Sequence, residues 1–187
     1  EDWKREAIKW TEALEPLKKL TNHHDIGFLM YCSFGNAYRL TGNEAYKEIL
    51  VESARSLCTR FDEKTSAIKS WKAWNGKDEW FYPVIIDNMM NLELLYFATK
   101  VTGDSCFANV ANKHAETTIK NQFREDYSNY HVVNYDEETG EVLHRDSRTI
   151  RLGRVGRHGP SMAIRWLIVR LKDRIFWIWQ FVLPISG

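Results

Sequence analysis

A repeat with a period of about sixty residues constrains this chain more than any other feature. Thr41-Gly42-Asn43 and Thr102-Gly103-Asp104 are turns of the same kind, 61 residues apart. An acid precedes each turn by a similar distance, Asp25 by 16 residues and Asp87 by 15. Repeats of this length, built from pairs of helices, are typical of stacked or closed helical arrays. A third acid is due near residue 150, where the sequence becomes basic and glycine-rich.

The periodicity of apolar residues predicts five helices. Two of them, residues 25–40 and 84–101, are apolar around most of their circumference, as buried helices are, whereas residues 2–20, 44–60 and 105–123 are amphipathic. Inner apolar helices that alternate with outer amphipathic helices indicate two concentric layers. We therefore expect an all-α fold of the α/α toroid type.

Short β-hairpins are expected between the helical pairs. Residues 69–76 contain the turn dipeptide Asn75-Gly76, and residues 130–143 contain a glycine turn between two apolar stretches. In a toroid, this arrangement places Asp25 and Asp87 at the end of the ring where the hairpins lie.

Charge is distributed unevenly. Residues 148–187 carry +7 and the other residues carry −6, which sum to the net charge of +1. Such a basic segment can bind a polyanion. The three cysteines lack metal-ligand spacing, so we expect buried thiols and no metal site. No uncharged apolar stretch reaches the roughly 20 residues that span a bilayer; we expect no membrane span, and a periplasmic or a cytoplasmic location both stay open.

Asp87 is the first candidate for chemistry. It follows Val84-Ile85-Ile86 and precedes Met89-Met90, so its carboxylate should be partly desolvated. Desolvation raises the pKa of a carboxyl group and suits it to general acid catalysis. The alternative is an acid that is stabilised by a helix N-terminus or that bonds the next hairpin.

His24 and Asp25 form a second candidate site. Asp25 could orient His24, and the pair could bind a substrate hydroxyl or carboxylate; the alternative is a helix N-cap beside exposed histidines. A metal is not expected here because no third ligand has matching spacing. Trp71 and Trp74 could stack on a sugar ring, although packing within the hairpin is the commoner use of such residues.

Several of these blocks together resemble the unsaturated glucuronyl hydrolases of glycoside hydrolase family 88, with family 105 as a near relative. The resemblance covers residues 10–147, and the family fold is an (α/α)6 barrel of about twice this chain's length. The blocks that carry it are His24-Asp25-Ile26-Gly27-Phe28, the segment from Ile85 to Leu92, the two Thr-Gly turns, His114-Ala115, and the segment from Asp136 to Glu141.

The resemblance implies an enzyme of polysaccharide degradation. Its substrate would be the 4,5-unsaturated uronic acid at the non-reducing end of an oligosaccharide made by a lyase. Hydration of the vinyl ether would release the remaining sugar, with no metal or organic cofactor. Asp87 matches one of two family aspartates. The second is expected in a Ser-Asp block that this chain lacks. His24, Asp25, Asn88, Trp71 and Trp74 are expected to bind substrate.

Residues 148–187 depart from the family, so we divide the chain into a partial toroid domain, 1–147, and a divergent basic tail. A frameshift near residue 148 would explain the tail. Codons allowed for residues 152–165, read one base further along, encode Ser-Asp-Glu-Ser-Ala-x-x-Gly-Gln-Ala-Trp-x-Tyr-Gly, close to the missing block. We expect such an incomplete chain to have little or no hydrolase activity. The alternative functions are a non-catalytic helical module that binds an anionic polysaccharide or other polyanion through the tail, and a sugar-binding module without catalysis. No nucleic acid is expected as a partner.

Overall fold

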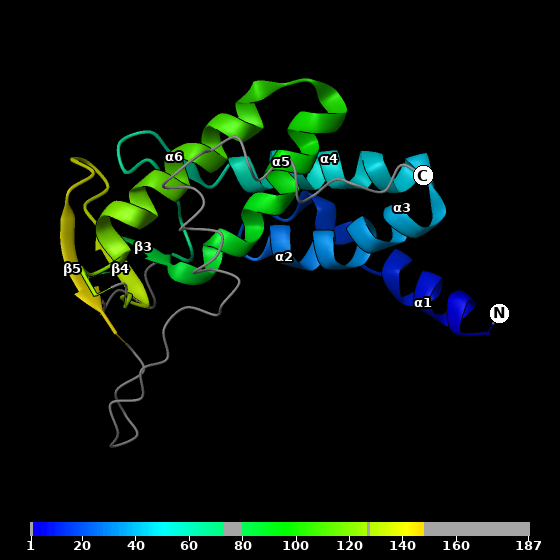
Figure 1. Ribbon diagram of the computed structural model, residues 1–187, viewed down its shortest axis with the longest axis horizontal. Helices are drawn as coiled ribbons and strands as arrows, with labels where there is room; N and C mark the ends of the chain where they lie inside the picture. Colours follow the sequence, from blue (N-terminus) through cyan, green and yellow to red (C-terminus); the bar gives the residue numbers. More distant parts are fainter. Residues whose placement is uncertain (1, 73–79, 127, 148–187) are drawn as a thin grey trace, which may run out of the picture.

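The computed structural model describes residues 2–72, 80–126 and 128–147 (Figure 1). The basic tail and Trp74 lie outside the described residues, as does the predicted Asn75-Gly76 turn. The elements, in chain order, are α1 (Asp2–Glu12), η1 (Glu15–Lys19), α2 (Ile26–Met30), η2 (Tyr31–Gly35), α3 (Asn36–Thr41), α4 (Glu44–Cys58), β1 (Phe61–Asp62), β2 (Ala67–Ile68), β3 (Tyr82–Ile85), η3 (Ile86–Asn91), α5 (Leu92–Thr102), α6 (Ser105–Gln122), β4 (Val132–Tyr135) and β5 (Val142–Asp146).

The two Thr-Gly turns of the repeat have the same geometry. Gly42 and Gly103 both adopt left-handed backbone conformations, with φ of 67° and 74°, and end the preceding helix. Asn43 and Asp104 then cap α4 and α6, each accepting a hydrogen bond from the backbone N–H two residues later. The predicted repeat is therefore confirmed as two helical hairpins of the same design.

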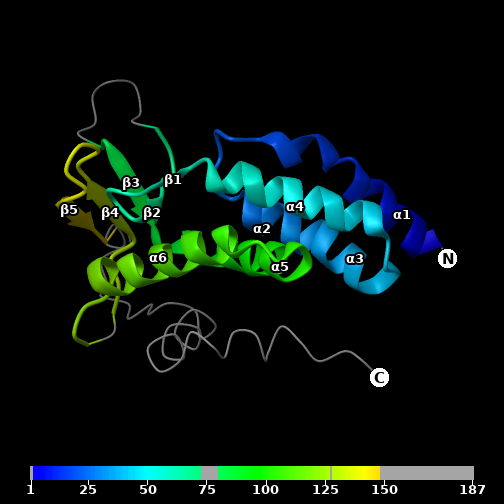
Figure 2. The same cartoon turned by 90° about the horizontal axis from the view of Figure 1, so that it is seen from above.

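One core joins the two hairpins. The continuous helical segment 26–41 packs on α4 and α5, and α5 packs on α6. Buried apolar side chains from all of these helices form a single cluster that includes Met30, Phe34, Leu50, Leu95 and Ala111. The helices lie side by side, and the strands gather at the end of the molecule far from the N-terminus (Figures 1 and 2).

The strands differ in part from the expectation. Residues Tyr82–Ile85 form a strand that pairs antiparallel with β4, so the predicted helix at 84–101 begins later, at Ile86. The hairpin nearest to the expected one at 69–76 is β1–β2, at residues 61–68. The second predicted hairpin is confirmed as β4–β5. Pro83 is tolerated in this strand because the proline ring fixes a φ that an extended chain can adopt. Proline has no backbone N–H, so it leaves no donor unpaired.

Two further expectations are corrected at the surface. The predicted helix 2–20 stops at Glu12, and a short 3-10 turn follows with Pro16 in its first turn, because proline cannot continue an α-helix. Cys32 and Cys106 are exposed rather than buried, and Cys58 is partly exposed.

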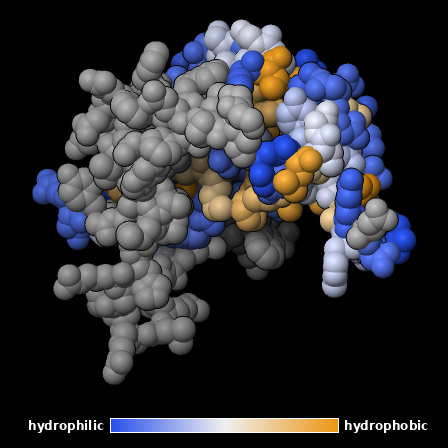
Figure 3. Space-filling model, turned by 45° about the vertical axis from the view of Figure 1, so that its right-hand side comes forward, coloured by the Kyte–Doolittle hydropathy of each residue, from blue (hydrophilic) through white to orange (hydrophobic). Residues whose placement is uncertain are grey.

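Apolar side chains remain on the surface of the described chain. Figure 3 shows apolar side chains interspersed with hydrophilic ones on one face. Among the exposed large side chains are Trp3, Trp10, Phe28, Leu40 and Met90. Within the described residues, no helix combines the length and the hydropathy that crossing a bilayer requires.

Candidate active site

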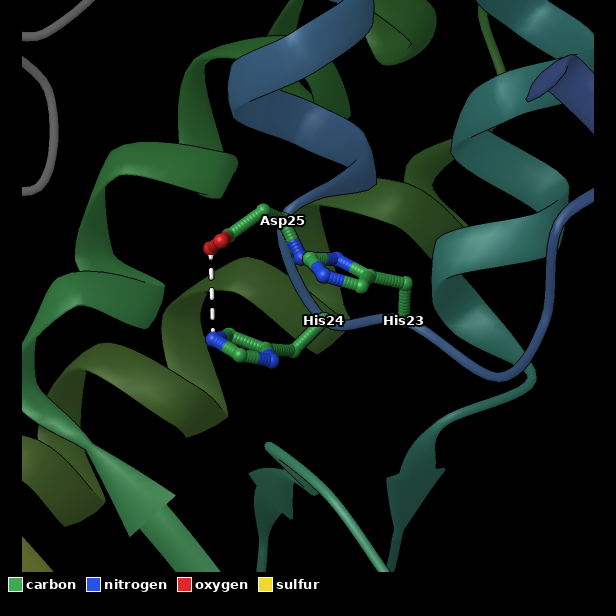
Figure 4. A group of neighbouring side chains, drawn as sticks. All are labelled: His23, His24 and Asp25. Atoms are coloured by element: carbon green, nitrogen blue, oxygen red, sulfur yellow. Dashed lines mark hydrogen bonds and ion pairs between the residues drawn. The ribbon is translucent and has the colours of Figure 1, made fainter.

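The start of α2 carries Asp25 in an arrangement that leaves its carboxylate available. Asp25 stands at the N-cap position of α2, but its side chain accepts no capping hydrogen bond. Asn91 caps the helix instead, because its Oδ1 accepts a hydrogen bond of 2.9 Å from the backbone N–H of Phe28, 63 residues earlier in the chain. The Asp25 carboxylate faces His24, with Oδ1 3.3 Å from Nε2 (Figure 4). Asp25 thus occupies the N-cap position that the alternative interpretation gave it, but its carboxylate does not act as the cap.

Asp87 lies in the first turn of η3 and is exposed. In a 3-10 helix, residues three apart lie above one another. Asp87 and Met90 consequently share the exposed face, while Ile86 and Met89 are buried. Asp87 is therefore open to solvent beside Met90, although Ile86 and Met89 on either side of it in the sequence point into the core, and the expected partial burial of its carboxylate is not found.

A close backbone approach holds the two aspartate-bearing segments together. A Cβ atom on Gly27 would lie 2.5 Å from Cα of Asn91 and 2.7 Å from its carbonyl oxygen. Only glycine allows α2 and η3 to come this close. α2, whose N-cap is Asp25, and η3, which holds Asp87, therefore lie against each other, and β3 leads directly into η3.

Ser70 joins these segments to the strands. Its backbone N–H donates to Pro83, and its Oγ accepts hydrogen bonds from the backbone N–H of Ile85 (2.9 Å) and from Nδ2 of Asn88 (3.2 Å). Ser70 is almost wholly buried, so it fixes β3 and the segment that carries Asp87 relative to each other.

Asn88, which the sequence predicts to bind substrate, has a supporting place in this structure, and its role towards substrate stays a prediction. Its side chain is fully buried, and Nδ2 also donates to the carbonyl of Ile68 at 2.6 Å. The side chain holds the turn on which Asp87 sits.

The His24 ring lies between charged and aromatic neighbours. Burial lowers the pKa of His24 below its ordinary value; the charge of Asp25 opposes this shift and His23 reinforces it. His24 is therefore mainly neutral at pH 7. Its ring centroid is 6.1 Å from that of Trp71, which places Trp71 beside the His24–Asp25 pair, where the sequence predicted a sugar-binding surface.

Sequence reasoning missed three residues that organise this site: Gly27, Ser70 and Asn91. Gly27 carried a usable signal, because a glycine inside an apolar helix indicates a close backbone approach. Ser70 and Asn91 carried none, since their partners are distant in the sequence.

Comparison with known proteins confirms the resemblance found in the sequence. No family model matches the chain. An unsaturated glucuronyl hydrolase of Formosa agariphila is 47% identical over 146 residues, covering 78% of this chain and 36% of that protein. The solved structure of an unsaturated glucuronyl hydrolase specific for heparin aligns with a TM-score of 0.67 and 47% identity, over 72% of this chain and 35% of that one.

A third relative adds information on aspartates. The unsaturated glucuronyl hydrolase from Streptococcus agalactiae aligns with a TM-score of 0.70 and 32% identity, over 77% of this chain and 36% of that one. That protein has also been solved with single aspartate-to-asparagine substitutions at two positions 60 residues apart, with TM-scores to this chain of 0.54 and 0.55. Asp25 and Asp87 are 62 residues apart.

The chain spans little more than a third of the length of the relatives that it matches. Its described part is homologous to the unsaturated glucuronyl hydrolases and has the fold of a fragment of their (α/α)6 barrel.

Proposed function

We propose that residues 10–147 form the aspartate-bearing part of a hydrolase that acts on 4,5-unsaturated uronic acid at the non-reducing end of an oligosaccharide. The observation that supports the proposal is the close contact of Gly27 with Asn91, which holds together the two segments that carry Asp25 and Asp87. Their separation of 62 residues is close to that of the two aspartates replaced in the streptococcal relative.

The proposed reaction begins with a proton. A carboxyl group gives its proton to C4 of the vinyl ether, and positive charge develops at C5 and the ring oxygen. Water adds at C5 while a carboxylate takes up one of its protons, so the acid is restored. The resulting hemiketal opens and releases the remaining sugar.

We assign both carboxyl groups within this chain. Asp87 is the aspartate that the sequence selected. Asp25 takes the place of the second acid, which we had expected in a block beyond residue 147. The two side chains are open to solvent to different degrees: Asp87 is exposed, and the Asp25 side chain is 35% exposed beside His24. Trp71, next to His24, would support the sugar ring.

A chimera tests this assignment in a complete barrel. Residues 10–147 would replace the corresponding segment of the Formosa agariphila relative, which is 47% identical to this chain over 146 residues. Turnover of an unsaturated glucuronyl disaccharide would be followed by the loss of its ultraviolet absorbance as the double bond disappears. We expect turnover by the chimera, and a fall in kcat of about 10²–10⁴-fold in Asp25→Asn and in Asp87→Asn.

Asp104→Asn is the matched control, because the same change removes a carboxylate at a cap where asparagine already serves in the other repeat, at Asn43. Its kcat should equal that of the chimera. An Asp25→Asn chimera with undiminished kcat would exclude Asp25 from the pair. The 187-residue chain alone should show little or no turnover.

A further inference from the structure

We propose that Asn91 is a positioning residue: by capping α2 in place of Asp25, it leaves the Asp25 carboxylate free to act in the reaction. The catalytic part of this inference rests on the proposed function, whereas its structural part concerns the 187-residue chain alone. Asn91 ends η3, the segment that carries Asp87, and its side chain bonds the backbone of α2, the helix that begins after Asp25. One residue thus contacts both aspartate-bearing segments.

Asp25 stands at the position from which a side chain ordinarily caps a helix. Its backbone carbonyl accepts the first helical hydrogen bond, from the N–H of Leu29 at 2.8 Å. A side-chain oxygen at this position usually accepts a second bond, from an N–H two or three residues later, and aspartate is among the preferred residues. Asn43 and Asp104 do so at the starts of α4 and α6, whereas Asp25 does not. Some other group must therefore satisfy the N–H that Asp25 leaves.

Asn91 accepts from the donor that Asp25 would use. Phe28 is the third residue after Asp25, and its N–H donates to Oδ1 of Asn91 at 2.9 Å. The amide and the carboxylate compete for this one N–H. Asn91 is fully buried and is packed so closely on Gly27 that a Cβ there would lie 2.6 Å from its Cβ, so its side chain has little freedom to lose. The Asp25 side chain is 35% exposed and would have to give up water, so the amide wins.

The carboxylate that is kept off the cap has a different neighbour. Its Oδ1 lies 3.3 Å from Nε2 of His24, and it keeps its access to solvent (Figure 4). A carboxylate that accepts a backbone N–H at a helix N-terminus is stabilised in its charged form, and it takes up a proton less readily. The cap by Asn91 spares Asp25 this loss of basicity. Because an amide is uncharged, the cap also adds no second negative charge beside Asp25.

The nuclear magnetic resonance signal of the Phe28 N–H, followed against pH in the 187-residue chain, tests the structural part. In the parent, this N–H bonds an uncharged amide, so we expect its shift to change little over the range in which carboxyl groups ionise. In Asn91→Ala, the Asp25 carboxylate should take the N–H, and the signal should move downfield as the pH rises. The double variant Asn91→Ala/Asp25→Asn should lose this response, which assigns it to Asp25.

The chimera described above tests the catalytic part. Asn91→Ala should lower its kcat by about tenfold or more while KM changes little, because the change reorients a reacting group and removes no sugar contact. The limb of the pH profile of kcat that Asp25 sets should move to lower pH, a shift that a loss of stability alone does not cause. Asp104→Ala is the matched control, since it removes the cap of α6. It should lower the urea midpoint and leave kcat and the pH profile unchanged.

Two results would overturn the proposal: a Phe28 signal in Asn91→Ala that does not respond to pH, or an Asn91→Ala chimera with the kcat and pH profile of its parent. A chimera without turnover would contradict the proposed function instead, and the Phe28 signal would still decide whether Asn91 frees Asp25.

Urea unfolding of Asp25→Ala covers the case in which Asn91→Ala does not fold. Its midpoint should equal that of the parent, because the Asp25 side chain caps nothing, whereas Asp104→Ala should lower the midpoint. An equal fall in both variants would show that Asp25 caps α2 and would overturn the proposal.

Discussion

Replacement of Gly27 by alanine tests the contact that brings the two aspartates together. Gly27 is a helical residue of α2, and alanine is the better helix former by about 1 kcal/mol. Local propensity alone thus predicts that Gly27→Ala stabilises the protein. The structure predicts the opposite, because the new methyl group would lie 2.5–2.7 Å from three atoms of Asn91, two of them backbone atoms.

The size of the effect follows from two contributions. Overpacking of a tight contact costs about 1–3 kcal/mol. Separation of α2 from η3 also breaks the hydrogen bond from Phe28 to Asn91, a loss of about 0.5–1.5 kcal/mol. After the gain in helix propensity, the free energy of unfolding should fall by about 1–3 kcal/mol.

Gly35→Ala is the matched control in the same helical segment. Gly35 has helical φ and ψ of −61° and −46°, and the three atoms nearest to an added Cβ would all belong to the ring of Tyr31, at 3.0–3.2 Å. A side chain can yield where a backbone cannot, so this variant should stay within about 1 kcal/mol of the parent. Urea unfolding of the three proteins measures both effects. A Gly27→Ala protein that is as stable as the parent would refute the reasoning.

Three further predictions concern buried polar groups and the coding sequence. His114 is fully buried, and burial lowers its pKa to about 4. Between about pH 6.5 and pH 4, the unfolded chain therefore binds a proton at this histidine that the folded chain does not bind. The free energy of unfolding should fall by about 3 kcal/mol as the pH drops through this window, and the fall should be absent in His114→Gln. Ser70→Ala leaves the backbone N–H of Ile85 buried without its acceptor, so the free energy of unfolding, measured with urea, should fall by about 1–3 kcal/mol. Ser105→Ala, at an exposed position, is the control and should change the free energy of unfolding by less than about 0.5 kcal/mol. Sequencing of the source DNA past codon 148 should reveal, in the shifted frame, the Ser-Asp block followed by further helical repeats; early stop codons in that frame would show the tail to be authentic.

The sequence predicted those parts of the fold that depend on neighbouring residues. In each Thr-Gly turn, the threonine hydroxyl bonds a carbonyl four residues earlier, and the cap bonds an N–H two residues later. All of these partners lie within one turn of helix. Local sequence is therefore sufficient to specify the turns. Because the turns repeat, the sequence also predicted that Asp25 and Asp87 stand at equivalent positions, at the same end of their helical hairpins.

The sequence could not predict features that depend on distant partners. Val84 and Ile85 suit a buried helix as well as a buried strand, and only pairing with β4, about 50 residues later, makes them a strand. The exposure of Asp87 depends on whether its segment forms a 3-10 helix, with three residues per turn, or an α-helix, with 3.6 residues per turn. The local sequence does not determine which of the two forms. The cap of α2 by Asn91 and the burial of Asn88 against Ile68 likewise arise from tertiary packing.

The most direct test of the proposed site is a nuclear magnetic resonance titration of the 187-residue chain with an unsaturated glucuronyl disaccharide, with its saturated counterpart as the control. The account predicts shifts in the backbone N–H signals of Asp25 and Asp87 and in the indole N–H of Trp71, caused by the unsaturated sugar and not by the saturated one. Shifts that fall elsewhere, or none at saturating sugar, would contradict the assignment of this end of the helical hairpins as the substrate site.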